Sequence, residues 1–99
     1  MSPVASIALS GLHAASSRLK TAAHNIANAQ TAGFRRQLVQ QTAQAEGGVT
    51  VSIGRAAEAG DALIEDVVAQ MAATHAFEAN VLTLKAQDRL FGSLLDVTA

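Results

Sequence analysis

Two interleaved seven-residue series run through the first third of the chain. One series carries a large apolar side chain at each repeat and the other carries an alanine: Leu12, Leu19 and Ile26 form the first, and Ala8, Ala15, Ala22 and Ala29 form the second. This is the spacing of positions a and d in a helix that lies along another helix. Because one row is only alanine, a second helix can approach closely on that side. The pattern therefore predicts a long amphipathic helix that needs a partner.

The first helix is predicted within residues 1–33. Ser2 can cap its free N–H groups, and Pro3 suits its first turn, where a missing N–H costs nothing. The helix should run to about Ala29 or Gln30.

A second long helix is predicted over residues 61–97, with Asp61 as its capping residue. Large apolar side chains recur along one of its faces, mostly at three- and four-residue steps and with an interruption at Asp88: Val67, Met71, Phe77, Val81, Leu84, Phe91 and Leu95. Together with the large row of the first helix, we expect them to carry the contacts between helices. The expected fold is mainly α and a single domain, in which two long helices form an antiparallel, coiled-coil-like pair.

The connecting segment, residues 34–60, offers at most a short β segment. Residues 49–53 alternate between apolar and polar side chains, which predicts one short strand there. The segment before Gly47 is ambiguous between helix and extended chain, and it contains no clear second strand.

Composition and spacing argue against several classes of function. The chain has no cysteine, and His13 and His24 would lie about 16 Å apart along one helix, so no metal site is expected. No catalytic constellation and no phosphate-binding loop is present, so we expect no enzyme, no cofactor and no small-molecule substrate. Basic residues are few and scattered, which argues against nucleic-acid binding, and no apolar run is long enough for membrane insertion.

The charges are divided unevenly along the chain. Residues 1–45 carry four basic residues and no acid, whereas residues 46–99 carry all eight acidic residues. This division favours pairing of the two ends, within one chain or between chains, with chance as the alternative.

Asparagine is a poor residue in the middle of a helix, yet Asn25, Asn28 and Asn80 all fall in predicted helices or at their ends. They are either exposed to solvent or pair with neighbouring helices and so determine the register; we favour the second interpretation. Interior Gly11 marks a kink or a close approach of two backbones. The motif that follows the first helix includes Thr31, Gly33 and Phe34, and its glycine suits the left-handed position beyond a helix end.

The stretch ALSGLHAASSRLKTAAHNIANAQTAGF, residues 8–34, resembles the N-terminal signature of the bacterial flagellar axial proteins of the rod and hook. The matching positions are Ala8, Leu9, Gly11, Leu12, Ala14, Leu19, Ala22, Asn25, Ile26, Ala27, Asn28, Thr31, Gly33 and Phe34. Residues 65–90 are similar to the closing helix of that family, at Glu65, Val68, Ala76, Phe77, Glu78, Asn80 and Asp88, and Asp61 fits the residue that opens this helix.

The resemblance implies a structural component of the flagellar basal body, most simply a rod subunit, that self-assembles through its terminal helices. It implies copies of the chain, other axial proteins and the export apparatus related to type III secretion as partners. It also implies export without a cleaved signal into a rod that spans the periplasm. The short connecting segment departs from the family, whose members usually carry a larger central region, and His75 and Phe77 stand where arginine and tyrosine are common. The chain would then be a minimal rod-type member, or a divergent paralogue that builds no filament. The alternative function is a small helical adaptor, chaperone or regulator that binds one partner helix.

Overall fold

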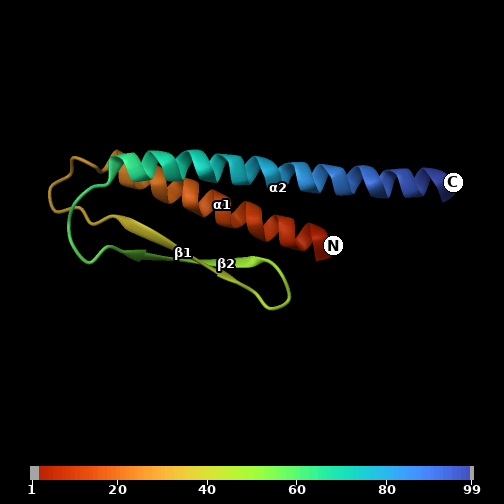
Figure 1. Ribbon diagram of the computed structural model, residues 1–99, viewed down its shortest axis with the longest axis horizontal. Coiled ribbons are helices and arrows are strands. Elements are labelled where there is room, and N and C mark those ends of the chain that lie inside the picture. Colours follow the sequence, from red (N-terminus) through yellow and green to blue (C-terminus); the bar gives the residue numbers. More distant parts are fainter. Residues whose placement is uncertain (1–2, 99) are drawn as a thin grey trace.

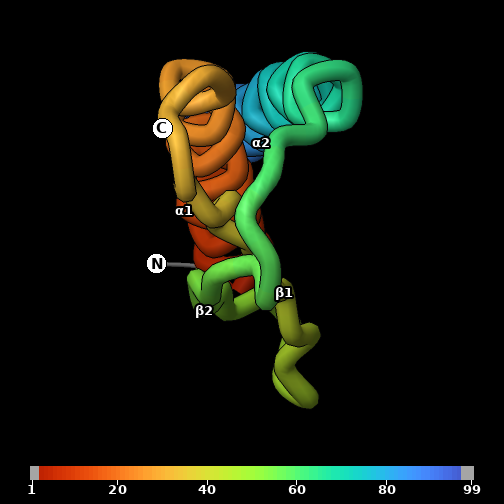
Figure 2. Tube along the Cα trace, turned by 90° about the vertical axis from the view of Figure 1, so that its left-hand side faces the viewer, coloured from red at the N-terminus to blue at the C-terminus, as the bar shows by residue number. Residues whose placement is uncertain are grey.

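The computed structural model describes residues 3–98, and its elements follow the order α1 (Pro3–Ala27), β1 (Gln37–Ala43), β2 (Val49–Arg55) and α2 (Leu63–Thr98). The two helices lie side by side and antiparallel, and the β1–β2 hairpin lies along α1 (Figures 1 and 2). The molecule is elongated, with extents of 63 × 25 × 13 Å. The prediction of a mainly α fold with a long antiparallel helix pair is confirmed.

The ends of the helices differ slightly from the predicted ones. Pro3 is the first residue of α1, as expected, while the proposed capping residue Ser2 lies outside the described residues. The helix α1 ends at Ala27, two residues early, because the chain tightens there: the N–H of Ala29 donates to the carbonyl of Ile26 at 3.2 Å.

The capping role expected of Asp61 is wrong. The first hydrogen bond of α2 runs from the N–H of Asp66 to the carbonyl of Ala62, at 2.9 Å. Ala62 is therefore the residue that precedes the helix, and Asp61 lies one position too early to cap it. Negative charge near this end comes instead from Glu65 and Asp66 in the first turn of α2.

The expectation of a single strand is also wrong, because residues 37–43 form a second one. β1 pairs antiparallel with β2, from Gln37 opposite Arg55 to Ala43 opposite Val49. The turn between them uses Gly47 and Gly48, whose φ angles of 100° and 90° favour glycine. Most residues of β1 are exposed, so its sequence needs no apolar alternation, and the turn and the pairing with β2 specify the strand.

Small residues form the contact between the two helices. On α1 the buried apolar residues are Ala8, Ala14, Ala15 and Ala22, and on α2 the buried apolar residue is Ala73. The close approach predicted for the alanine row is thus present, whereas Leu12, Leu19 and Ile26 are only half-buried. Ala29 lies beyond the end of α1.

Gly11 marks a close approach and not a kink. A Cβ atom at this position would lie 2.6 Å from Oδ1 of Asn80 on α2. Asn25 and Asp66 form the second cross-helix contact, through a hydrogen bond of 3.5 Å. The two contacts are fourteen residues apart on each helix, which is two seven-residue repeats, so they share one register.

Candidate functional site

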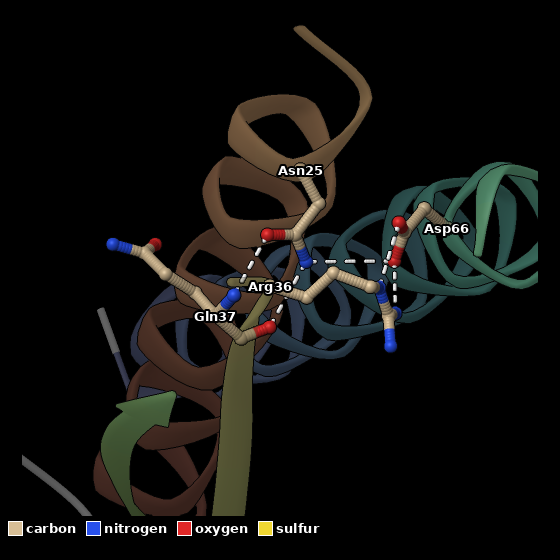
Figure 3. A network of polar contacts seen from close by, with 4 residues as sticks. All are labelled: Asn25, Arg36, Gln37 and Asp66. Atoms are coloured by element: carbon tan, nitrogen blue, oxygen red, sulfur yellow. Dashed lines mark hydrogen bonds and ion pairs between the residues drawn. The ribbon is translucent and has the colours of Figure 1, made fainter. Parts of the chain in front are cut away.

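Four residues from three elements meet at the end of the helix pair that lies nearest the strand β1 (Figure 3). We call this cluster the polar junction; it consists of Asn25 on α1, Arg36 just before β1, Gln37 at the start of β1 and Asp66 on α2. Asn25 and Asp66 are 2% and 3% exposed, so their polar atoms need partners within the protein.

The side-chain amide of Asn25 binds the backbone of β1. Its Oδ1 accepts from the N–H of Gln37 at 2.8 Å, and its Nδ2 donates to the carbonyl of Gln37 at 2.9 Å. Only an amide side chain offers one donor and one acceptor in this arrangement. Asn25 therefore fixes β1 on α1.

Asp66 connects α2 to the same point. Its carboxylate accepts from Nε of Arg36 at 3.1 Å and from Nη2 of Arg36, a bidentate pair. The hydrogen bond to Asp66, together with its negative charge, raises the pKa of Arg36 above its ordinary value. This ion pair joins the basic N-terminal half of the chain to the acidic C-terminal half, as the charge division suggested.

The remaining residues of the N-terminal motif organise the turn after α1. Nδ2 of Asn28 donates to the carbonyl of His24 at 2.9 Å, and Oγ1 of Thr31 donates to Oδ1 of Asn28 at 3.3 Å. Gly33 has a φ of 72°, in the left-handed region, as expected. Phe34 packs edge to face on His24, with ring centroids 5.4 Å apart. These contacts return the chain toward Asn25. Within the described part of the chain, the side chain of Asn28 bonds only to His24 and Thr31 and not to α2.

Asn80 occupies the second register point. Its Nδ2 donates to the carbonyl of Ala76 at 2.8 Å, while its side chain lies against Gly11. The amide is therefore bonded within α2, and its packing, not a hydrogen bond, marks the register against α1.

The large apolar side chains of α2 lie mostly on its outside. Of the predicted contact residues on this helix, Val81 and Leu84 are half-buried, and the others are exposed: Val67, Met71, Phe77, Phe91 and Leu95. Five further apolar residues outside that predicted contact set are exposed to a similar or greater extent: Ile64, Val68, Leu82, Leu90 and Leu94. We call these ten exposed residues, which exclude the half-buried Val81 and Leu84, the outer apolar surface. The adjacent apolar pairs Leu63–Ile64 and Val67–Val68 could have indicated an outer apolar face, since neighbouring residues in a helix face different sides.

No other arrangement in the described residues suggests chemistry. Residues 3–98 contain no group of three His, Cys, Asp or Glu side chains placed to hold a metal ion. None of the described helices is long and apolar enough to cross a membrane.

Comparison with known proteins agrees with the N-terminal resemblance. Residues 6–35 match the model of a family described as flagella basal body rod protein. This match supports the flagellar rod family, a structural family, and with it a component of the flagellar basal body. No curated protein gives a match. The likeness of residues 65–90 to the closing helix lies outside the matched segment and stays a prediction.

Proposed function

We propose that this chain, whose residues 6–35 match the basal-body rod family, is a rod subunit that self-assembles through α1 and α2. The observation that carries the proposal is the difference between the two faces of α2. Small and polar residues of this helix face α1, while the outer apolar surface is exposed.

An exposed surface of this kind favours association. Ile64 is 82% exposed, and Val68, Met71 and Leu82 are each about 60% exposed. Burying one such side chain contributes about 1.5–3 kcal/mol, so covering several of them exceeds the usual ordering costs of an interface. Apolar patches that extend along a whole helix are typical of interaction surfaces.

The lengths of the helices add to this argument. In the register set by Gly11 and Asn80, the start of α1 lies opposite Asp88, so residues 89–98 extend α2 beyond α1 by about 15 Å (Figure 1). Leu90 and Phe91 on this extension are 63% and 51% exposed. A neighbouring subunit in line with the first would cover them.

The partners and the route are part of the same proposal. The chain binds copies of itself and other axial proteins, passes through the flagellar export apparatus, and becomes part of the rod that spans the periplasm. The family match supports this part of the proposal.

The test uses a change that the isolated chain tolerates. Leu82→Asp places a charge in the outer apolar surface, and Ala79→Asp places the same charge at an exposed position one turn away. We expect both variants to retain the helical circular dichroism of the wild type. Only Leu82→Asp should remove the chain from purified basal bodies and abolish swimming. If cells with Leu82→Asp swim normally, the proposal fails, and a defined 1:1 complex absent from basal bodies would favour the adaptor.

A further inference from the structure

The β1–β2 hairpin has two outer edges, and the hydrogen bonds show which residues face them. In an antiparallel pair, the N–H and C=O of one residue point to the same side, and successive residues alternate. The N–H and C=O of Gln37 both bind Asn25, so Gln37 points away from β2. The residues of β1 that face its outer edge are therefore Gln37, Val39, Gln41 and Ala43.

The same reasoning applies to β2. The N–H of Val49 donates to Oγ of Ser10 at 3.1 Å, so Val49 points away from β1. The register agrees, because Val49 lies opposite Ala43. The residues of β2 that face its outer edge are Val49, Val51, Ile53 and Arg55.

Each edge is thus closed at one end by a side chain of α1. Asn25 closes the β1 edge at Gln37, and Ser10 closes the β2 edge at Val49. Within residues 3–98, no hydrogen bond occupies the three remaining outward positions of either strand: Val39, Gln41 and Ala43 on β1, and Val51, Ile53 and Arg55 on β2.

These open edges lack the usual protection against strand pairing. β1, QLVQQTA, contains no charge and no proline, and β2, VTVSIGR, contains one charge at its end. A two-stranded hairpin is also marginally stable alone. Space is available beside β1, where a cleft is lined by Thr21 and Ala22 of α1, Val39 and Gln41 of β1, and Ala69 of α2.

We propose that the β1 edge of one copy of this chain pairs antiparallel with the β2 edge of a second copy. Val39, Gln41 and Ala43 then lie opposite Arg55, Ile53 and Val51 of the second copy. In this register, all three open positions of each edge meet, and the ends closed by Asn25 and Ser10 fall just outside the paired region.

A second copy fits these edges better than an unrelated strand. The two edges have equal numbers of open positions, and β1 and β2 run in opposite directions, so copies in one orientation present complementary edges. No like charges face each other in the proposed register. Every copy uses both edges, which gives a head-to-tail interface that closes into a ring or continues as a helical array. The inference rests on the proposed self-assembly and specifies one of its contacts.

The test uses the absence of native cysteine. Gln41→Cys and Ile53→Cys are made in separate full-length chains and produced together in cells, and isolated basal bodies are oxidised. The mixture should give at least about tenfold more cross-linked dimer than either variant alone, because disulfides need Cα atoms within about 7 Å. Thr42→Cys with Ile53→Cys is the matched control, since Thr42 faces β2 in its own hairpin.

Each other outcome overturns the inference. Dimers formed by Gln41→Cys alone would show pairing of two β1 edges. Chains present in basal bodies without any cross-link would sink the edge pairing and leave the proposed function intact. If the chain is absent from basal bodies, the same two purified variants are mixed and oxidised at high concentration. Lack of the cross-link there would also overturn the edge pairing.

Proline gives an independent measurement. Gln41→Pro removes an N–H that faces the open edge, so the hairpin should fold while the cross-link at neighbouring Val39 and Arg55 is lost. Gln40→Pro removes an N–H that faces β2 and should unfold the hairpin itself. Retention of the cross-link between Val39→Cys and Arg55→Cys in the Gln41→Pro background would contradict the proposed pairing.

Discussion

The side-chain amide of Asn25 pairs with both backbone groups of Gln37, at 2.8 and 2.9 Å, as a residue of an adjacent strand would. The same amide lies 3.5 Å from the carboxylate of Asp66. One side chain of α1 therefore positions both the first strand and the second helix. This explains why an asparagine occupies a buried position in the last turn of α1, where its helix propensity is poor.

Asn25→Ala should destabilise the chain by about 2 kcal/mol, because it leaves the N–H and C=O of Gln37 without partners. Asn25→Asp should cost more, since it loses the donor and adds a carboxylate beside Asp66. Urea unfolding followed by circular dichroism measures both. Equal stability of the aspartate variant and the wild type would contradict the role assigned to this amide.

Asp66→Ala should cost about 3 kcal/mol, because it leaves the half-buried guanidinium of Arg36 without its counter-ion. Asp66→Asn should cost less, since an amide oxygen still accepts from Arg36. The exposed neighbour gives the control: Glu65→Gln should change the free energy of unfolding by less than about 0.5 kcal/mol. If Asp66→Ala and Glu65→Gln have the same free energy of unfolding, the polar junction contributes nothing to stability.

Gly11→Ala should destabilise the helix pair, although alanine is the better helix former by about 1 kcal/mol. The new Cβ atom would meet Oδ1 of Asn80 at 2.6 Å. Asn80→Ala in the same chain should restore much of the loss, and a double-mutant cycle measures this coupling.

Gly92→Ala is the control for this cycle. No atom of residues 3–98 lies within 4 Å of the added Cβ atom in α2, so this change should stabilise the chain by up to about 1 kcal/mol. Stabilisation by Gly11→Ala to the same extent would show that the helices do not meet at this register.

Gly33→Ala should cost about 1 kcal/mol through backbone strain alone, because φ is 72° and no atom of the described residues lies within 4 Å of the new Cβ atom. Gly33→Asn should cost less, since asparagine tolerates the left-handed conformation better. Thermal unfolding of the two variants and of Gly54→Ala, whose surroundings are equally open, makes the comparison. Equal melting temperatures for the three variants would show that position 33 does not require a left-handed backbone conformation.

The sequence predicts well the elements whose apolar residues recur with a strong period. The alanine row of α1, read at Ala8, Ala15 and Ala22, predicted the close helix contact, because only small side chains permit it. The left-handed Gly33 followed from the same physical rules, whereas Gly11 was left open between a kink and a close approach until the structure showed the second. β1 was missed because its sequence, QLVQQTA, has no apolar alternation, although it is exposed in the same pattern as β2.

The polar junction could be predicted only in part. Asn25 and Asn80 lie where α1 and α2 meet, whereas Asn28 bonds within the turn after α1. Nothing local to Asp66 distinguished it from Glu65 beside it. Its partner, Arg36, is thirty residues away, and only the turn after α1 and the hairpin bring them together. On α2, large residues were expected to face the partner helix. They lie outside because Asp66, Ala73 and Asn80 occupy the inner positions at seven-residue intervals.

The central claim is that the outer apolar surface of α2 joins this chain to the flagellar rod. Quantitative mass spectrometry of basal bodies purified from cells with the wild type, Leu82→Asp or Ala79→Asp tests it most directly. We expect the wild-type chain and the Ala79→Asp variant at equal levels, and the Leu82→Asp variant to be lost from basal bodies while it remains folded in the cell. Equal amounts of Leu82→Asp and wild-type chain in basal bodies, or no wild-type chain there, would contradict the claim.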